Sequence, residues 1–153
     1  MRLTPTALAG TVRTVLRLHR GAFDAICALA FQEYPLEMCG LIAGAPDPGA
    51  APDSATAERF YACRNAAESA KVYSIDPLEF MRVEDDADDH GWEINGVVHS
   101  HTHSEPYPSP TDVAQAIDPS WHYVIVSLKR DAPELRSYRI VEGEIAEERV
   151  ELA

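Results

Sequence analysis

The sequence HSHTHSEPYPSPTD, residues 99–112, carries the strongest structural and chemical signal in the chain. It follows an apolar run that is typical of a buried β-strand. Alternate side chains of a strand share one face, so His99 and His101 should project together from its end. The tetrapeptide from Ser109 to Asp112 then has the pattern of a helix N-cap with proline at the first helical position. The stretch therefore predicts a strand, a loop and a helix start.

Two imidazoles and a carboxylate are ligand types that a catalytic zinc ion takes, with a fourth position left to water. His99, His101 and Asp112 are therefore candidate metal ligands. His103 continues the alternation and could replace His99 if the strand ran on, so histidine spacing alone does not choose the pair. The capping pattern explains the Ser109 to Asp112 segment without any metal, and both interpretations can hold together.

Hydrophobic periodicity predicts an α/β fold with a mixed β-sheet flanked by helices, in a single domain over residues 1–153. The predicted elements are a strand over 12–18, a helix that includes residues 23–31, strands over 36–43, 57–63 and 72–75, a helix that begins after Asp76, strands over 94–101 and 121–128, and a hairpin over 135–150. Pro35 should end the first helix, and Glu79 should complete a capping-box-like arrangement with Asp76. The five acids within 84–89 are typical of a solvated helix end.

Thirteen Lys and Arg residues against twenty-five Asp and Glu residues give a net charge of −12. This charge argues against nucleic acid and anionic membranes as partners. The sequence has no apolar run of the roughly 18 residues that a membrane span needs, so we expect a cytoplasmic protein. Cys27, Cys39 and Cys63 are odd in number and form no CxxC pair, which fits reduced thiols. Cys39 as a nucleophile is a weaker hypothesis than the metal site.

His99, His101, Ser109 and Asp112 match the pattern H-x-H-x7-S-x2-D, and Glu37 lies upstream in the apolar run PLEMCGLIAG. On these residues the chain resembles the JAMM (MPN+) metallopeptidases, whose fold is cytidine-deaminase-like. The resemblance covers most of the chain. It implies that the two histidines and the aspartate hold Zn2+, that Glu37 is the general base and acid, and that Ser109 stabilises the oxyanion.

The runs HSHTHSEPYPSPTDV, HYVIVS and ELRSYRI are similar to small bacterial members of this family. That similarity implies a ubiquitin-like sulfur-carrier protein as partner, hydrolysis after its Gly-Gly tail, and release of a C-terminal cysteine in cysteine biosynthesis. No residue by itself specifies cysteine. An extended tail can add a strand to an exposed sheet edge, and we expect the segment 69–75 to supply that edge.

Two other functions are compatible with parts of the sequence. A PHP-type metal phosphoesterase also begins with closely spaced histidines, but its further ligands need a longer chain, and only His122 follows His103. A non-catalytic interaction module on the same fold is the second alternative. His19, His90 and His122 have no spacing that marks them for a role.

Overall fold

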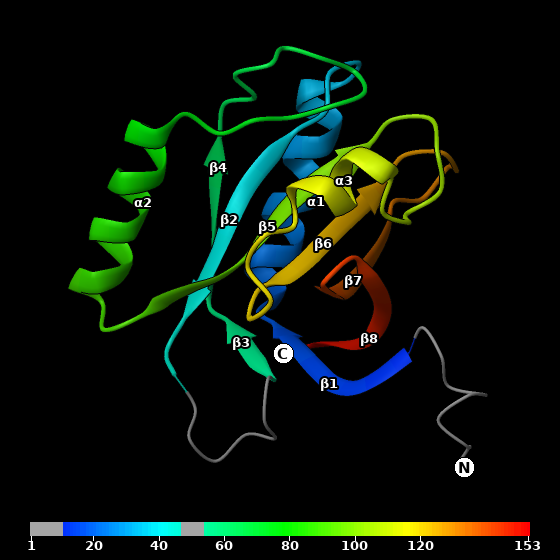
Figure 1. Ribbon diagram of the computed structural model, residues 1–153. Coiled ribbons are helices and arrows are strands. Elements are labelled where there is room, and N and C mark those ends of the chain that lie inside the picture. The colour runs from blue at the N-terminus through cyan, green and yellow to red at the C-terminus, as the bar shows by residue number, and fades with distance from the viewer. Residues whose placement is uncertain (1–10, 47–53) are drawn as a thin grey trace.

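The computed structural model describes residues 11–46 and 54–153. Strands of these residues form one mixed sheet of eight strands in the order β3-β1-β8-β7-β6-β5-β2-β4 (Figure 1). The elements are β1 (Thr11–Leu18), α1 (Arg20–Glu33), β2 (Cys39–Gly44), β3 (Ala55–Ala57), β4 (Arg59–Cys63), α2 (Pro77–Asp89), β5 (Glu93–His101), α3 (Pro110–Gln115), β6 (His122–Ser127), β7 (Glu134–Val141) and β8 (Glu144–Leu152). The α/β fold with a mixed sheet flanked by helices is thereby confirmed. No helix of the described ranges is long and apolar enough to cross a membrane.

Helices cover the two faces of the sheet separately (Figure 1). On one face, α1 buries its apolar side in a cluster that includes Ile26 and Val98. On the other face, Val83 of α2 and Val113 of α3 pack with a cluster that includes Val97. Neighbouring residues of β5 thus belong to opposite cores, as the two-residue period of a strand requires. The odd-numbered side chains at the end of β5 consequently face α2 and α3.

The segment that contains Glu37 joins α1 to β2 and is fastened beside β5. β2 pairs antiparallel with β5, with Cys39 opposite His99. Just before that pair, the Ser100 backbone N–H donates to the Met38 carbonyl over 3.1 Å, and the Met38 N–H donates to Ser100 Oγ over 2.8 Å. The pairing brings Glu37 to the same edge of the sheet as the histidines. Met38 and Ser100, which make these two hydrogen bonds, are 62 positions apart in the chain.

Cys39 and Cys63 are buried on the paired strands β2 and β4, and Cys27 is partly buried on α1. Cys27, Cys39 and Cys63 are all free cysteines. Burial, with smaller contributions from Cys63 and nearby acids, raises the pKa of Cys39 to about 12. A thiol with this pKa is almost entirely protonated near neutral pH, which argues against Cys39 as a nucleophile.

Two predicted strands differ from the structure. The run over 57–63 is divided at Glu58 between β3 and β4, and β3 pairs with β1 whereas β4 pairs with β2. The prediction of a strand over 72–75 is wrong, and so is the expected sheet edge over 69–75: these residues form irregular loop. Glu79 is not part of a capping box, since its Oε1 accepts from the Arg64 backbone N–H over 2.9 Å instead.

Asn65 explains why the 66–75 segment is ordered without being a strand. Its side chain is 3% exposed, and its Nδ2 lies 3.1, 3.3 and 3.0 Å from the carbonyl oxygens of Glu37, Ser69 and Val72. Its Oδ1 accepts from two further backbone N–H groups of the loop, at 2.9 and 3.2 Å. One buried amide therefore satisfies backbone groups that a strand would pair in a ladder.

Replacing Asn65 with alanine is expected to lower the free energy of unfolding by about 2 to 4 kcal/mol, because several buried backbone groups lose their partner at once. Denaturant unfolding measures the loss, and faster amide exchange confined to 65–74 locates it. Asn95→Ala is the matched control: Asn95 donates to Thr56 O alone over 3.1 Å, and its Oδ1 has no partner among the described residues. Equal losses in both variants would contradict the assignment to Asn65.

A polar network lies buried between β6, β7, β8 and β1. His122 Nδ1 and Ser137 Oγ each lie 2.6 Å from Glu148 Oε2, and Thr14 Oγ1 donates to Oε1 over 2.8 Å. Burial disfavours the charged carboxyl, but these hydrogen bonds outweigh burial and lower the pKa of Glu148 below its ordinary value. No local pattern marked His122 for a role, because its partner Glu148 is 26 positions away in the chain.

Since the pKa of Glu148 is lower in the folded than in the unfolded chain, its contribution to stability is present above a pH of about 4.5 and is lost as pH falls through the folded value. Glu148→Gln should therefore cost about 1.5 to 3 kcal/mol near neutral pH and progressively less as the pH falls below about 4.5. Melting temperatures across this pH range test the prediction. Glu147→Gln removes an exposed ion pair with Arg136 and should change little; a pH-independent cost at Glu148 would refute the argument.

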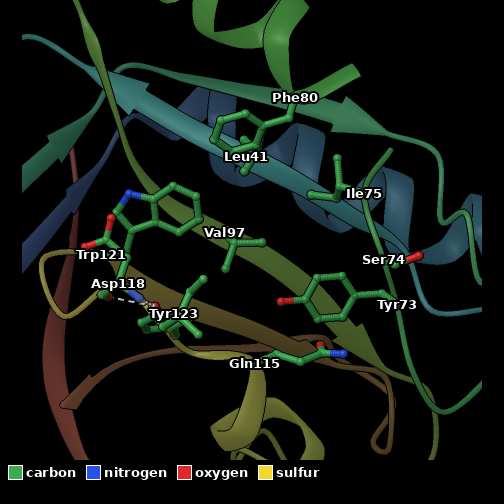
Figure 2. A pocket seen from close by; sticks show the side chains of 11 residues that line it. Leu41, Tyr73, Ser74, Ile75, Phe80, Val97, Gln115, Asp118, Trp121 and Tyr123 are labelled. Carbon is green, nitrogen blue, oxygen red and sulfur yellow. Dashed lines mark hydrogen bonds between the residues drawn. The ribbon is translucent and has the colours of Figure 1, made fainter. Parts of the chain in front are cut away.

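An apolar cavity of about 430 Å³ remains between α2, α3 and the sheet (Figure 2). Phe80 of α2 stacks on Trp121 at one end, with ring centroids 6.0 Å apart. Tyr73, from the loop that Asn65 organises, lines the cavity from the other side. The remaining lining residues are Leu41, Ser74, Ile75, Val97, Gln115, Ile117, Asp118 and Tyr123. The cavity adjoins the histidine edge of the sheet through Tyr73.

Candidate metal centre

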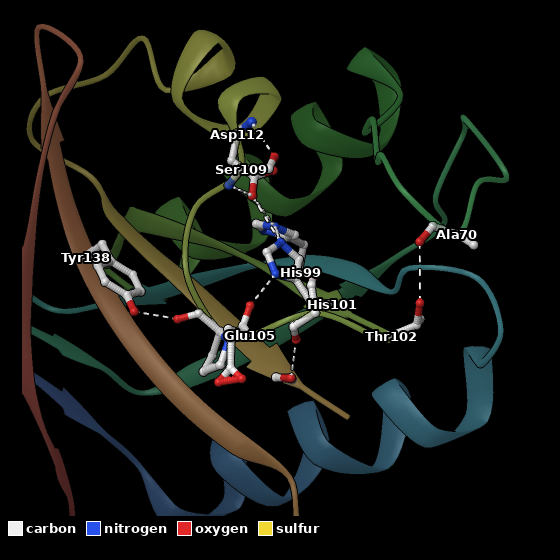
Figure 3. Close-up of polar contacts among 11 residues, drawn as sticks. Ala70, His99, His101, Thr102, Glu105, Ser109, Asp112 and Tyr138 are labelled. Atoms are coloured by element: carbon white, nitrogen blue, oxygen red, sulfur yellow. Dashed lines mark hydrogen bonds and ion pairs between the residues drawn. The ribbon is translucent and has the colours of Figure 1, made fainter. Parts of the chain in front are cut away.

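β5 and α3 deliver the three predicted metal ligands from opposite sides of one loop. His99 and His101 are the last odd-numbered residues of β5 and are 3% and 5% exposed. Ser109 caps α3, its Oγ accepting from the Asp112 N–H over 3.1 Å while Asp112 Oδ2 accepts from the Ser109 N–H over 2.9 Å. The predicted capping box is confirmed, and it holds the Asp112 carboxylate towards the end of β5 (Figure 3).

The ligand atoms converge on one point. His99 Nε2 and His101 Nε2 lie 3.2 Å apart, and each lies 3.1 Å from Asp112 Oδ2. Atoms bound about 2.0 to 2.1 Å from a tetrahedral zinc ion lie about 3.3 to 3.4 Å from each other. The nearly equilateral triangle of two nitrogens and one oxygen therefore fits a zinc ion. Within the described part of the chain, His99, His101 and Asp112 form a group whose ligand atoms all lie within 4.8 Å of one another.

Hydrogen bonds and ring contacts around the two histidines also favour Nε2 atoms that point at the centre of the triangle. His101 Nδ1 donates to the Glu105 carbonyl over 2.7 Å, which leaves the lone pair of Nε2 directed at the centre (Figure 3). The loop that carries this carbonyl is itself fastened: Ser127 Oγ donates to Ser104 O over 2.6 Å, and Tyr138 OH donates to Pro106 O. Tyr73 stacks on His99 with ring centroids 4.6 Å apart. Sequence patterns identified neither Tyr73 nor the Glu105 carbonyl.

Electrostatics keep Asp112 ionised. Burial opposes its charge, but hydrogen bonds with His101 and His99 outweigh burial and hold the pKa of Asp112 well below its ordinary range. Burial lowers the pKa of His99, which favours the neutral imidazole that a metal requires. For His101, the contacts with Asp112 and with Glu105 O exceed the effect of burial and raise the pKa. An anionic carboxylate and at least one neutral imidazole thus face the centre.

Glu37 lies beside the ligands but does not belong to their cluster. The residue is 3% exposed, and its buried Oε1 has no hydrogen-bond partner within the described residues. Burial, opposed by the charge of His101 and reinforced by that of Asp112, raises the pKa of Glu37 to about 8. A carboxyl group with this pKa can accept and release a proton near neutral pH. Its unpaired oxygen is available to a substrate or a water molecule.

His103 lies outside the ligand cluster. Its Nε2 contacts Tyr34 OH over 3.0 Å, and its Nδ1 contacts Thr102 Oγ1 over 3.1 Å. β5 ends at His101, so the strand alternation stops before His103. The structure therefore places His99 and His101, but not His103, close to the Asp112 carboxylate.

An eight-stranded mixed sheet with two histidines and an aspartate converging at one strand end, beside a buried glutamate, defines a candidate metal-dependent hydrolase site. A family model described as prokaryotic homologs of the JAB domain matches residues 19–141. The chain belongs to this family. The resemblance to JAMM proteins is thereby confirmed, and the family gives no support to a PHP-type phosphoesterase.

Individual relatives agree with this assignment. The CysO-cysteine peptidase of Mycobacterium tuberculosis is 41% identical over 146 residues, which cover 92% of each chain. The solution structure of protein DSY2949 from Desulfitobacterium hafniense has a TM-score of 0.81 at 32% identity and covers 90% of this chain and 92% of that one. A structure described as a JAMM metalloprotease-like zinc site in the proteasome and signalosome has a TM-score of 0.55 at 20% identity, over 90% of this chain and 98% of that one. The last likeness concerns the fold alone.

Proposed function

We propose that this protein is a zinc-dependent peptidase that hydrolyses the C-terminal amino acid, cysteine, from the Gly-Gly tail of a ubiquitin-like sulfur-carrier protein. The observation that carries the proposal is the triangle of His99 Nε2, His101 Nε2 and Asp112 Oδ2, with edges of 3.1 to 3.2 Å, beside the buried carboxyl of Glu37. The name of the 41% identical relative supports the substrate class.

His99, His101 and Asp112 would hold the zinc ion, which when bound polarises a carbonyl group and lowers the pKa of a bound water to about 7. Glu37 accepts a proton from the attacking water while the oxygen of that water bonds to the carbonyl carbon of the last glycine. Glu37 then donates that proton to the amine nitrogen as the C–N bond breaks. The products are a carrier that ends in the Gly-Gly carboxylate and a free amino acid.

Ser109 has a hydroxyl proton left for the substrate. Its Oγ accepts from the Asp112 N–H, so its own O–H can donate to the oxygen on which negative charge develops. Such a donor is worth on the order of 100-fold or more in rate. In this proposal Ser109 both fixes Asp112 and stabilises the oxyanion.

The proposal is tested by incubating the zinc-loaded protein with a sulfur carrier that ends Gly-Gly-Cys and following the carrier by mass spectrometry. The expected result is loss of one cysteine residue, abolished by a chelator and restored by zinc. A carrier that already ends Gly-Gly serves as the control and should keep its mass. An intact Gly-Gly-Cys carrier that nevertheless binds the zinc-loaded protein would instead favour the non-catalytic module.

A further inference from the structure

A second cavity, of about 310 Å³, opens on the Glu37 side of the candidate metal centre. Glu37, Lys71, His101, His103 and Ser109 are among its lining residues. The apolar cavity of Figure 2 lies instead behind Tyr73, which stacks on His99. Residues with polar or charged side chains make up most of the lining of the second cavity, which we call the polar cavity, and of the two cavities only this one is lined by Glu37.

This asymmetry indicates the direction in which a peptide crosses the site. A general acid must come within about 2.6 to 3.2 Å of the nitrogen that it protonates. Because Glu37 lines the polar cavity, the leaving amine faces that cavity. In a C-terminal amino acid, the carboxylate carbon is only about 2.5 Å from the amine nitrogen, from the N–Cα and Cα–C bond lengths and the angle between them. The terminal carboxylate must therefore enter the polar cavity too.

Lys71 is the lysine that this cavity offers to a carboxylate. Along the described chain, its side chain makes no ion pair, whereas Lys129 and Arg130 both pair with Glu105 on the neighbouring loop. Acidic residues outnumber basic residues in this protein, whose net charge is −12, so a lysine beside the cavity without an acidic partner is a positive charge that an anionic ligand can use. A carboxylate in the cavity would find in Lys71 a charge-assisted hydrogen-bond donor.

The backbone that carries Lys71 is held in place. Ser69 Oγ accepts from the Lys71 N–H over 3.0 Å, and the Ala70 carbonyl accepts from Thr102 Oγ1 over 3.4 Å. Figure 3 shows this last bond linking the Lys71 loop to the residue that follows His101. The loop is therefore tied to the metal-ligand segment, and Lys71 itself is exposed and lines the cavity.

We propose that Lys71 binds the α-carboxylate of the amino acid that leaves, and thereby restricts the enzyme to conjugates with a free C-terminus. The inference rests on the proposed function and adds its specificity. A conjugate in which the terminal carboxylate is amidated, or continued by further residues, should be a poor substrate because Lys71 then has no anion to bind.

The test compares a carrier ending Gly-Gly-Cys as the free acid with the same carrier as the C-terminal amide. Lys71→Met is expected to lower kcat/KM for the acid by about 10- to 100-fold, the range of a charge-assisted hydrogen bond. For the amide it should change kcat/KM less than about 2-fold. Arg20→Met removes the same charge at the far end of α1 and should leave both substrates unchanged. Equal losses of Lys71→Met on acid and amide would overturn the proposal.

Binding without turnover provides a second readout. In the Glu37→Gln background, calorimetry should show the acid binding more tightly than the amide, and addition of Lys71→Met should abolish that difference. Equal affinities before Lys71 is changed would also overturn the proposal. Failure of the proposed function looks different: the enzyme with Lys71 intact would then hydrolyse neither conjugate.

Discussion

Glu37→Gln is expected to lower kcat for carrier hydrolysis by about 100- to 10,000-fold while leaving the bound zinc unchanged. Glutamine has the shape of glutamate but cannot take a proton from water and pass it to an amine. Glu37 is 3% exposed, its Oε1 has no partner in the described part of the chain, and it is not one of the three clustered ligands. In the proposed mechanism, the substitution would therefore remove proton transfer without removing a metal ligand.

Single-turnover kinetics and metal analysis of the same preparation measure both halves of this prediction. Glu58→Gln is the matched control, because Glu58 is an exposed glutamate between β3 and β4 and outside the cavity at the site. It should retain full activity. A Glu37→Gln protein that loses its zinc, or one that hydrolyses at the normal rate, would contradict the role given to Glu37.

Asp112→Asn is expected to remove both the bound metal and the activity. Asp112 Oδ2 lies 3.1 Å from each histidine Nε2 and accepts the Ser109 N–H over 2.9 Å, so one oxygen serves the ligand triangle and the helix cap. An amide supplies a neutral and weaker ligand, and it loses the charge that the two imidazoles face. We expect hydrolysis to fall by about 1000-fold or more, as a protein without its catalytic metal loses most of its rate.

Thermal unfolding with and without zinc measures the metal loss independently of hydrolysis. Zinc at 100 times its dissociation constant should stabilise the unsubstituted protein by about 2.7 kcal/mol, and this increment should vanish in Asp112→Asn. Asp118→Asn is the control. Asp118 lies in the loop after α3, where its Oδ1 accepts from the Ser120 backbone N–H, and this variant should keep the stabilisation by zinc. An undiminished zinc effect in Asp112→Asn would show that the ion binds elsewhere.

Much of the fold could be predicted because its signals are local. The alternation at the end of β5, the proline and serine at the start of α3, and the apolar face of α1 each depend on residues a few positions apart. The same locality explains the failure at Val72–Ile75. Four residues with strand propensity form no strand because Asn65 satisfies their backbone from outside the segment.

Contacts between segments that are far apart in the chain could not be predicted from the sequence. His122 has no pattern around it, and its meaning comes from Glu148 and Thr14 on other strands. Tyr73 is one tyrosine among six, and only the fold places it on His99. The polar cavity with Lys71 likewise exists only once the loop after β4 lies against the end of β5.

The sequence by itself determined the chemical inventory: an α/β chain with His99, His101 and Asp112 at a fixed spacing, a capping serine, and an upstream glutamate. The strand, the loop and the helix start follow from short-range periodicity and capping, which are properties of neighbouring residues, whereas Glu37 was singled out by the resemblance to the JAMM family. The tertiary structure decided that His103 stays outside the cluster, and that Glu37 and Lys71 line a cavity together with His101. Such decisions depend on strand pairing and loop packing, which bring together residues that no local pattern connects.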